Sequence, residues 1–275
     1  MPMEIRVATL EDWELLSCFF RRIYRTSHPL QNQDFWIWRF GESEFGASIV
    51  AINEGQIVGH VGVNRSSEIA WIINVFLDQD WRGKGLLAQM YSLAAEFGLP
   101  AATNVNDAGV GMYRKMGWIE LDNLRRFVFR DKSTPSSALL LPVERQEKFP
   151  QPQQHHYWRQ PGIVGIADQS GSTAVDFLIR GGLRMVEIVD PRCIEDFILN
   201  SGAKWADYVT SRNDPICEEL ESLGWKTDYE QNVPWLFNPI DQDSRMNINV
   251  FARNELPANL IIRRWDSDHG RVGSV

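Results

Sequence analysis

The run Arg82-Gly83-Lys84-Gly85 is the part of this sequence best suited to bind an anion. It lies between the apolar run Ile72 to Leu77 and a helical pattern from Leu86 to Phe97, which predicts a loop that joins a strand to a helix. Two glycines let the main chain approach an anion closely, the first amides of the helix carry partial positive charge, and the two basic side chains add formal charge. This chemistry suits a pyrophosphate, so the predicted ligand is a phosphorylated cofactor.

Two better-known glycine loops do not fit these surroundings. Gly83-x-Gly85-x-x-Ala88 matches a relaxed dinucleotide-binding pattern, but that pattern follows the first strand of a βαβ unit, and here a predicted hairpin precedes the loop. A Walker loop needs a Ser or Thr directly after its Gly-Lys pair, and this chain has neither there. The remaining alternative is an ordinary glycine turn before a helix.

A second motif follows the predicted helix. Asn106 precedes Tyr113 by seven residues, and Gly117-Trp118 closes the short helix that carries the tyrosine. An Arg-x-x-Gly loop followed by these residues in this order resembles the GNAT superfamily of acyl-CoA-dependent N-acyltransferases. The resemblance covers residues 4 to about 130 and implies acyl-CoA as the co-substrate, with no metal.

The resemblance also implies a role for each motif. A main-chain N–H near Leu77 would polarise the thioester carbonyl, Asn106 would bind the pantetheine, and Tyr113 would donate its hydroxyl hydrogen to the sulfur of coenzyme A. The residues expected at the pyrophosphate are Arg82, Gly83, Lys84, Gly85 and Leu86. For Tyr113 the alternative is a core tyrosine, because Met112 and Met116 lie beside it.

The general base is a separate question. His60 lies in the strand next to the predicted active-site strand and titrates near neutral pH, so it is a candidate base. Glu68 or Asn74 could act through a water molecule, and an amine of low pKa needs no dedicated base. The alternative for a single histidine in a strand is a structural role.

The segment Phe35-Trp36-x-Trp38-Arg39-Phe40 is the candidate acceptor site. Aromatic faces stack on sugars or bases, and arginine pairs with phosphate, so Trp36, Trp38 and Arg39 are the predicted substrate contacts. The alternative is a helix that buries its aromatic side chains. The layout is similar to family members that N-acylate nucleotide-linked amino sugars, which implies a dTDP- or UDP-linked acceptor. A peptide, a polyamine or another small amine remains open, as does a non-catalytic acyl-CoA sensor.

The elements around these motifs predict the fold. Ile5 to Ala8 can form a strand, and Thr9 to Asp12 forms the capping box of a helix that runs through Ile23. Asn53-Glu54-Gly55 predicts a hairpin turn between two strands. After the second motif, residues 118–121 and 124–129 are expected to close the sheet. The order predicts an α/β fold whose mixed, mostly antiparallel sheet is flanked by helices.

Composition sets the remaining bounds. With 275 residues, of which 44% are hydrophobic, the chain can build two compact domains, expected at 1–131 and 161–275 with a packed connector at 132–160. A net charge of −8 argues against broad binding to nucleic acid or anionic membranes. Three scattered cysteines, and no apolar run of membrane-spanning length, favour a cytoplasmic location.

The second half repeats part of the first. Five residues recur at a constant offset of 107 residues, namely Thr103, Asn106, Asp107, Gly117 and Trp118 as Thr210, Asn213, Asp214, Gly224 and Trp225. This spacing predicts a second GNAT-like domain. The copy is expected to be degenerate, because Asp190-Pro191 stands where the glycine loop would be and Leu220 replaces Tyr113. One acyl-CoA site per chain follows.

Overall fold

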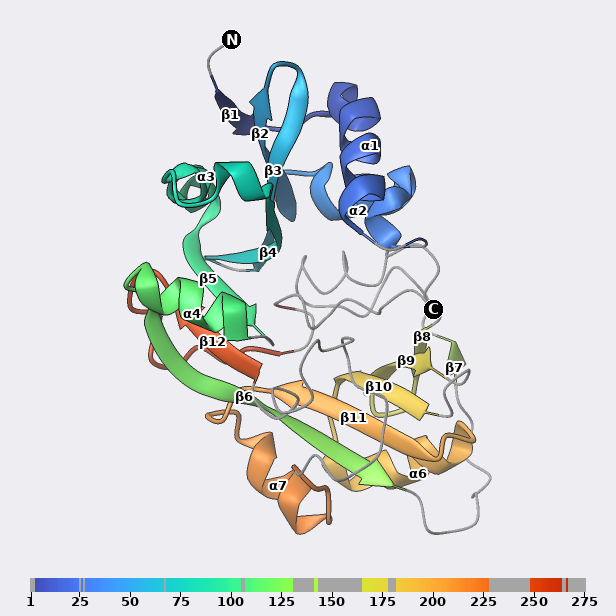
Figure 1. Ribbon diagram of the computed structural model, residues 1–275. Coiled ribbons are helices and arrows are strands. Elements are labelled where there is room, and N and C mark those ends of the chain that lie inside the picture. The colour runs from blue at the N-terminus through green and yellow to red at the C-terminus, as the bar shows by residue number, and fades with distance from the viewer. Residues whose placement is uncertain are drawn as a thin grey trace.

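One mixed sheet of 12 strands runs through the molecule (Figure 1). The computed structural model describes residues 3–24, 26, 28–66, 68–104, 107–130, 141–142, 165–177, 182–227, 248–263 and 266. The order of the strands across the sheet is β1-β2-β3-β4-β5-β12-β6-β11-β10-β9-β8-β7. Two of the pairings, β4 with β5 and β10 with β11, are parallel and the rest are antiparallel, so the predicted fold class is confirmed.

The first half of the sheet follows the predicted pattern. Its strands are β1 (Glu4–Val7), β2 (Gly46–Asn53), β3 (Gln56–Ser66), β4 (Ile69–Leu77) and β5 (Leu99–Asn104). The hairpin turn between β2 and β3 has Glu54 and Gly55 at φ 51° and 76°, which is the left-handed geometry that favours a tight hairpin. The capping box is also present, because the main-chain N–H of Thr9 donates to the carboxylate of Asp12 at 2.8 Å.

Helices cover both faces of these strands, as Figure 1 shows. α1 (Trp13–Ile23) and α2 (Gln33–Phe40) bury Phe20 and Trp36 against one face, together with Trp71 of β4. α3 (Leu86–Ala94) and α4 (Asp107–Lys115) bury Met90 and Tyr113 on the other face. Short 3-10 helices occur at Leu10–Asp12, Pro29–Gln31, Gln79–Trp81, Ala95–Phe97 and Pro191–Cys193.

The end of the first half differs from the prediction. The two segments expected at 118–121 and 124–129 form one continuous strand, β6 (Ile119–Arg130). The strand continues because each part has its own partner. Its first part pairs with β12 (Ile248–Ala252), which comes from the C-terminal region and lies between β5 and β6. Its second part pairs with β11 (Trp205–Thr210) and so joins the two halves of the sheet.

Besides β11 and β12, the second half contributes the strands β7 (Leu141–Pro142), β8 (Gly165–Ala167), β9 (Thr173–Phe177) and β10 (Gly182–Glu187). Its described helices are α6 (Ile194–Asn200) and α7 (Ile216–Ser222). Apart from β7, the expected connector 132–160 lies outside the described residues.

The helices α4 and α7 end in similar turns. Gly117 and Gly224 both have positive φ angles, of 74° and 86°. The next residue closes the same turn in each half: the N–H of Trp118 donates to the carbonyl of Tyr113 at 3.1 Å, and that of Trp225 to Leu220 at 3.0 Å. Both tryptophans are buried.

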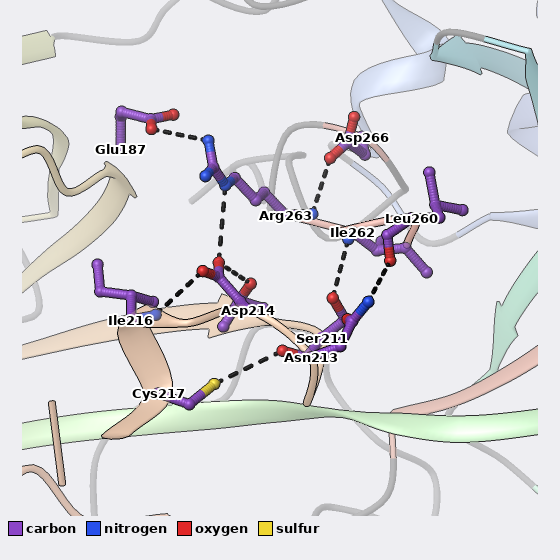
Figure 2. A network of polar contacts seen from close by, with 11 residues as sticks. Glu187, Ser211, Asn213, Asp214, Ile216, Cys217, Leu260, Ile262, Arg263 and Asp266 are labelled. Carbon is purple, nitrogen blue, oxygen red and sulfur yellow. Dashed lines mark hydrogen bonds and ion pairs between the residues drawn. The ribbon is translucent and has the colours of Figure 1, made fainter. Parts of the chain in front are cut away.

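A C-terminal segment ties the halves together. Arg263 donates to Glu187 of β10 at 2.8 Å and lies 3.7 Å from Asp214, close to the start of α7 (Figure 2). Asp266 accepts a hydrogen bond from Ser66 of β3, and its main-chain carbonyl accepts one from Asn64 at 2.8 Å. Polar contacts of Asp266 and Arg263, which are themselves joined by a hydrogen bond at 2.7 Å, therefore connect β3 to β10.

Candidate active site

The two parallel strands β4 and β5 separate at their carboxyl ends. They pair from Ile69 opposite Leu99 to Ile72 opposite Ala102, and the ladder stops there although β4 continues to Leu77. β5 keeps a partner on its other edge, because Thr103 and Asn104 pair with β12. From Ile73 to Leu77 this edge of β4 therefore has no ladder partner in β5, which leaves its main-chain groups for other partners.

A β-bulge lies at this point of β4. Between the pairs His60–Phe76 and Gly62–Ile73, one residue of β3 faces two of β4, Asn74 and Val75. Asn74 has φ 49°, which is uncommon for a residue other than glycine. A bulge bends its strand and re-aims the groups beyond it, and Leu77 lies beyond this one.

The predicted glycine loop follows directly. Gly83 and Gly85 have φ 74° and 75°, and a Cβ atom at either position would meet open space. The left-handed backbone therefore explains why both positions are glycine. This part of the loop faces outward. Gly85 is the N-cap of α3 and supplies no side chain to it, so no capping side chain occupies the first amides of this helix, which begins at Leu86. Such a helix start can accept an anion.

The charged side chains near the loop have defined partners. Arg82 donates through Nε to the carbonyl oxygen of Leu77 at 3.0 Å, and Nζ of Lys84 lies 4.7 Å from the centre of the Trp81 ring. The carboxylate of Asp78, directly after β4, is paired with Arg22 at 2.9 Å. This pair offsets the negative charge of Asp78 next to the strand end.

Tyr113 is buried on α4. Its ring lies 4.7 Å from Trp118 and 5.3 Å from Phe251 of β12, and its hydroxyl oxygen lies 3.5 Å from that of Tyr91. Burial raises the pKa of Tyr113 to about 12, so the phenol keeps its proton at neutral pH. It can act as a proton donor but not as a base. Asn106, the other predicted residue of this motif, lies outside the described residues.

His60 is inside the core and not on a surface. Its side chain is fully buried, with Nε2 at 2.8 Å from Ser48 Oγ and Nδ1 at 2.9 Å from the carbonyl oxygen of Asn74. Burial lowers the pKa of His60 to about 4. The ring is therefore neutral at physiological pH, and both of its nitrogens are already engaged.

The predicted acceptor residues are also buried. Trp36, Trp38 and Arg39 are 1%, 8% and 3% exposed, on a helix that packs against the sheet. The Arg39 guanidinium lies 5.5 Å from the Trp38 ring centre, and Trp36 lies 6.0 Å from Trp13. The three residues lie together, but in the core beside α1, so they present no open aromatic wall.

Two residues near Tyr113 were not among the predicted site residues. Tyr91 lies four residues after Leu87 on the same helix, and this spacing could have placed it on the buried face. Phe251 stands 138 residues after Tyr113 and comes near it only through the position of β12. No local signal could have found it.

Comparison with known proteins gives a family match for one part of the chain. Residues 12–118 match the model of the Acetyltransferase (GNAT) family. The match to a GNAT domain covers less than half of the 275 residues. The match contains the separated strands, the loop and Tyr113 that make up the candidate site, so the family match and the geometry concern the same part of the molecule.

Solved structures share the fold of the GNAT domain and of the part that follows it. A proposed acetyltransferase from Pyrococcus horikoshii is 16% identical, with a TM-score of 0.54 over 82% of this chain and 86% of that chain. A GCN5-related N-acetyltransferase from Kribbella flavida is 13% identical, with a TM-score of 0.54 over 78% of this chain and 66% of that chain. A conserved protein of unknown function from Enterococcus faecalis V583 is 9% identical, with a TM-score of 0.51 over 77% and 66%. No curated protein matches the chain by sequence.

Two kinds of feature are absent from the described residues. None of their helices is long and apolar enough to cross a membrane. Nowhere among them do three or more His, Cys, Asp or Glu side chains gather as a metal site would require.

Proposed function

We propose that this protein transfers an acyl group from acyl-CoA to the amine of a small acceptor. The observation that carries the proposal is the arrangement within the GNAT domain: β4 separates from β5, bends at a bulge, and leads through a left-handed glycine loop into α3. The loop faces open space at both glycines, and no side chain caps the helix. A pyrophosphate group fits such a cradle of main-chain amides.

The residues would divide the work as follows. Main-chain amides from Gly83 to Leu86 would hold the pyrophosphate, with charge from Arg82 and Lys84. A main-chain N–H near Leu77 would stabilise the oxyanion when the amine attacks the thioester carbonyl. Asn106 is proposed to contact the pantetheine.

Tyr113 would complete the reaction. As the new C–N bond forms, the C–S bond breaks and the departing thiolate takes the hydroxyl proton of Tyr113. The contact with Tyr91 supports this role, because Tyr91 donates to the Tyr113 oxygen and leaves the Tyr113 proton for another acceptor. The proton lost by the amine would pass to water, since the buried ring of His60 has both nitrogens engaged.

We propose further that residues 161–275 are a degenerate second copy of the GNAT domain at 1–131. The matching turns at Trp118 and Trp225, and the parallel pairs β4–β5 and β10–β11, support a common origin. The copy would not bind acyl-CoA, because the Asp190 side chain already accepts the N–H of Arg192 where the glycine loop would lie. One acyl-CoA per chain is expected.

For the acceptor, we propose a dTDP- or UDP-linked amino sugar as the first compound to test. This proposal is supported only by the resemblance in layout to enzymes that N-acylate nucleotide-linked amino sugars. The side chains of Trp36, Trp38 and Arg39 are buried and do not add to that support. The test measures thiol release from acetyl-CoA with nucleotide-linked amino sugars, the free amino sugars, polyamines and peptides. Higher activity on the nucleotide conjugate supports the proposal, and equal activity on the free sugar favours a small-amine acceptor.

The same assay separates an enzyme from a sensor. Acetyl-CoA binding measured by calorimetry, with no thiol release on any amine of the panel, would favour a non-catalytic acyl-CoA sensor. Failure to bind acetyl-CoA at all would contradict both the enzyme and the sensor.

A further inference from the structure

A line of hydrogen bonds crosses three strands beside the bulge of β4. Ser48 of β2 lies 2.8 Å from Nε2 of His60 on β3, and Nδ1 of His60 lies 2.9 Å from the main-chain oxygen of Asn74 on β4. Ser48 and His60 are both fully buried. The line therefore ends on the residue of β4 that has the left-handed backbone.

The chemistry of the partners fixes the direction of these hydrogen bonds. A carbonyl oxygen can only accept, so Nδ1 of His60 carries the hydrogen and donates it to Asn74. The low pKa of His60, about 4 because of its burial, keeps the ring neutral. Nε2 is then an acceptor, and the Ser48 hydroxyl donates to it.

The ring cannot easily turn away from this arrangement. Phe20 and Phe40 surround it with ring centres at 5.0 and 5.9 Å, both at steep angles, and Phe19 lies at 6.4 Å. All three belong to the α1 and α2 side of the sheet. Packing thus holds the imidazole so that one nitrogen meets the carbonyl of Asn74.

Asn74 needs such support. A non-glycine residue at φ 49° is strained and persists where its surroundings hold it there. The bulge also takes the Asn74 carbonyl out of the regular ladder between β3 and β4, and His60 supplies the hydrogen that this oxygen accepts.

We propose that His60 is a positioning residue for acyl transfer: through the carbonyl of Asn74 it fixes the bulge that aims the main-chain N–H groups near Leu77 at the acyl carbonyl. This inference rests on the proposed function. It replaces the candidate role of His60 as a base, because the group that His60 contacts is part of the protein and not the amine.

The first test needs only the unmodified protein. In ¹⁵N-labelled protein at pH 7, the nitrogen shifts and two-bond couplings of the His60 ring report which nitrogen carries hydrogen. A neutral ring with hydrogen on Nδ1 is expected. A ring with hydrogen on Nε2, or a charged ring, would overturn the proposal, and this result does not depend on any enzymatic activity.

The second test compares two substitutions of His60. In His60→Gln the side-chain amide can still donate to the Asn74 carbonyl and accept from Ser48, whereas His60→Phe fills the space and can do neither. His60→Phe is expected to lower kcat by about 100-fold, the effect of misplacing a group by about 1 Å, with the affinity for acetyl-CoA unchanged because the loop is untouched. His60→Gln should recover most of kcat.

A general base would give a different pattern. Equal losses in both variants, together with disappearance of the acidic limb of the pH profile of kcat/KM, would overturn the positioning role. If His60→Phe does not fold, Ser48→Ala is the substitute, since it keeps the ring but removes its second anchor. It should lower kcat with no change in the pH profile, and an unchanged kcat would count against the proposal.

Failure of the proposed function would look different again. If the wild-type protein neither binds acetyl-CoA nor releases thiol, the proposed acyl transfer is wrong. The tautomer of His60 would still show whether its ring donates to the Asn74 carbonyl at the bulge. A crystal structure of His60→Phe in which Asn74 keeps its left-handed backbone would refute the support of the bulge directly.

Discussion

The side chain of Arg82 donates a hydrogen bond from Nε to the main-chain carbonyl of Leu77 at 3.0 Å. The first residue of the glycine loop is thereby tied to the last residue of β4. The distance between the end of the strand and the start of α3 is thus held by a side chain as well as by the backbone. The proposed oxyanion donor and the proposed phosphate cradle would keep their spacing through this contact.

Two substitutions of Arg82 separate the effect of its charge from the effect of its hydrogen bond to Leu77. Arg82→Ala should weaken acetyl-CoA binding by about 10-fold or more, because a charge-assisted contact to phosphate contributes about 1.5–3 kcal/mol. Arg82→Lys keeps the charge but lacks the Nε–H, so it should recover only part of the affinity. Calorimetry gives the affinities, and the exposed Arg114, paired with Glu120, provides the control Arg114→Ala. Full recovery in Arg82→Lys would mean that only charge matters.

Tyr113→Phe removes only the hydroxyl group. Turnover should fall by about 10- to 10⁴-fold while the affinity for acetyl-CoA changes little, because the proton is needed only when the thiolate departs. The matched control is Tyr91→Phe, which removes the neighbouring buried hydroxyl and should affect turnover less. Steady-state and single-turnover rates are the measurements. Unchanged turnover with chemistry rate-limiting would leave Tyr113 with a structural role only.

Asp266 predicts a dependence of stability on pH. Burial raises the pKa of its carboxyl to about 6, against an ordinary value of 3.8. The folded state therefore holds this proton more tightly than the unfolded state. The stability linked to it is fully present below pH 3.8 and is lost as the pH rises through 6.

The contribution of this proton to the free energy of unfolding is roughly 3 kcal/mol at most. In Asp266→Asn this contribution is absent, so the difference in unfolding free energy between the variant and the wild type should shift in favour of the variant between pH 4 and pH 7. Urea unfolding at several pH values measures it. A difference that does not vary with pH would show that the carboxyl does not titrate in this range.

The local parts of the fold could be predicted from the sequence. The hairpin turn at Glu54-Gly55, the helix start at Thr9 and the left-handed glycines of the loop depend on the conformational limits of a few neighbouring residues. The turns at Gly117 and Gly224 belong to the same class. For these features the neighbouring residues determine the backbone conformation.

The features that were missed depend on distant residues. β12 enters the sheet between β5 and β6, and its place brings Phe251 against Tyr113. The bulge at Asn74 depends on its register with β3.

The aromatic residues of α2 show a second limit to prediction from the sequence. Their pattern predicts a helix, but it does not tell whether Trp36 and Trp38 line a site or fill the core, because both uses place large apolar rings at helical spacing. The packing of α1 decides this question, and it buries them.

The central claim is that the glycine loop cradles the pyrophosphate of acyl-CoA, and Gly85→Asp tests it most directly. The new side chain has room to fit, but it places a negative charge at the start of α3, where two like charges a few ångströms apart repel by about 4 kcal/mol near a protein surface. Gly55→Asp is the matched control, since Gly55 has φ 76° and equally open space in the turn between β2 and β3. Calorimetric titration with acetyl-CoA should show affinity lowered by about 100-fold or more in Gly85→Asp and unchanged in Gly55→Asp. Equal, wild-type affinity in both folded variants would contradict the account.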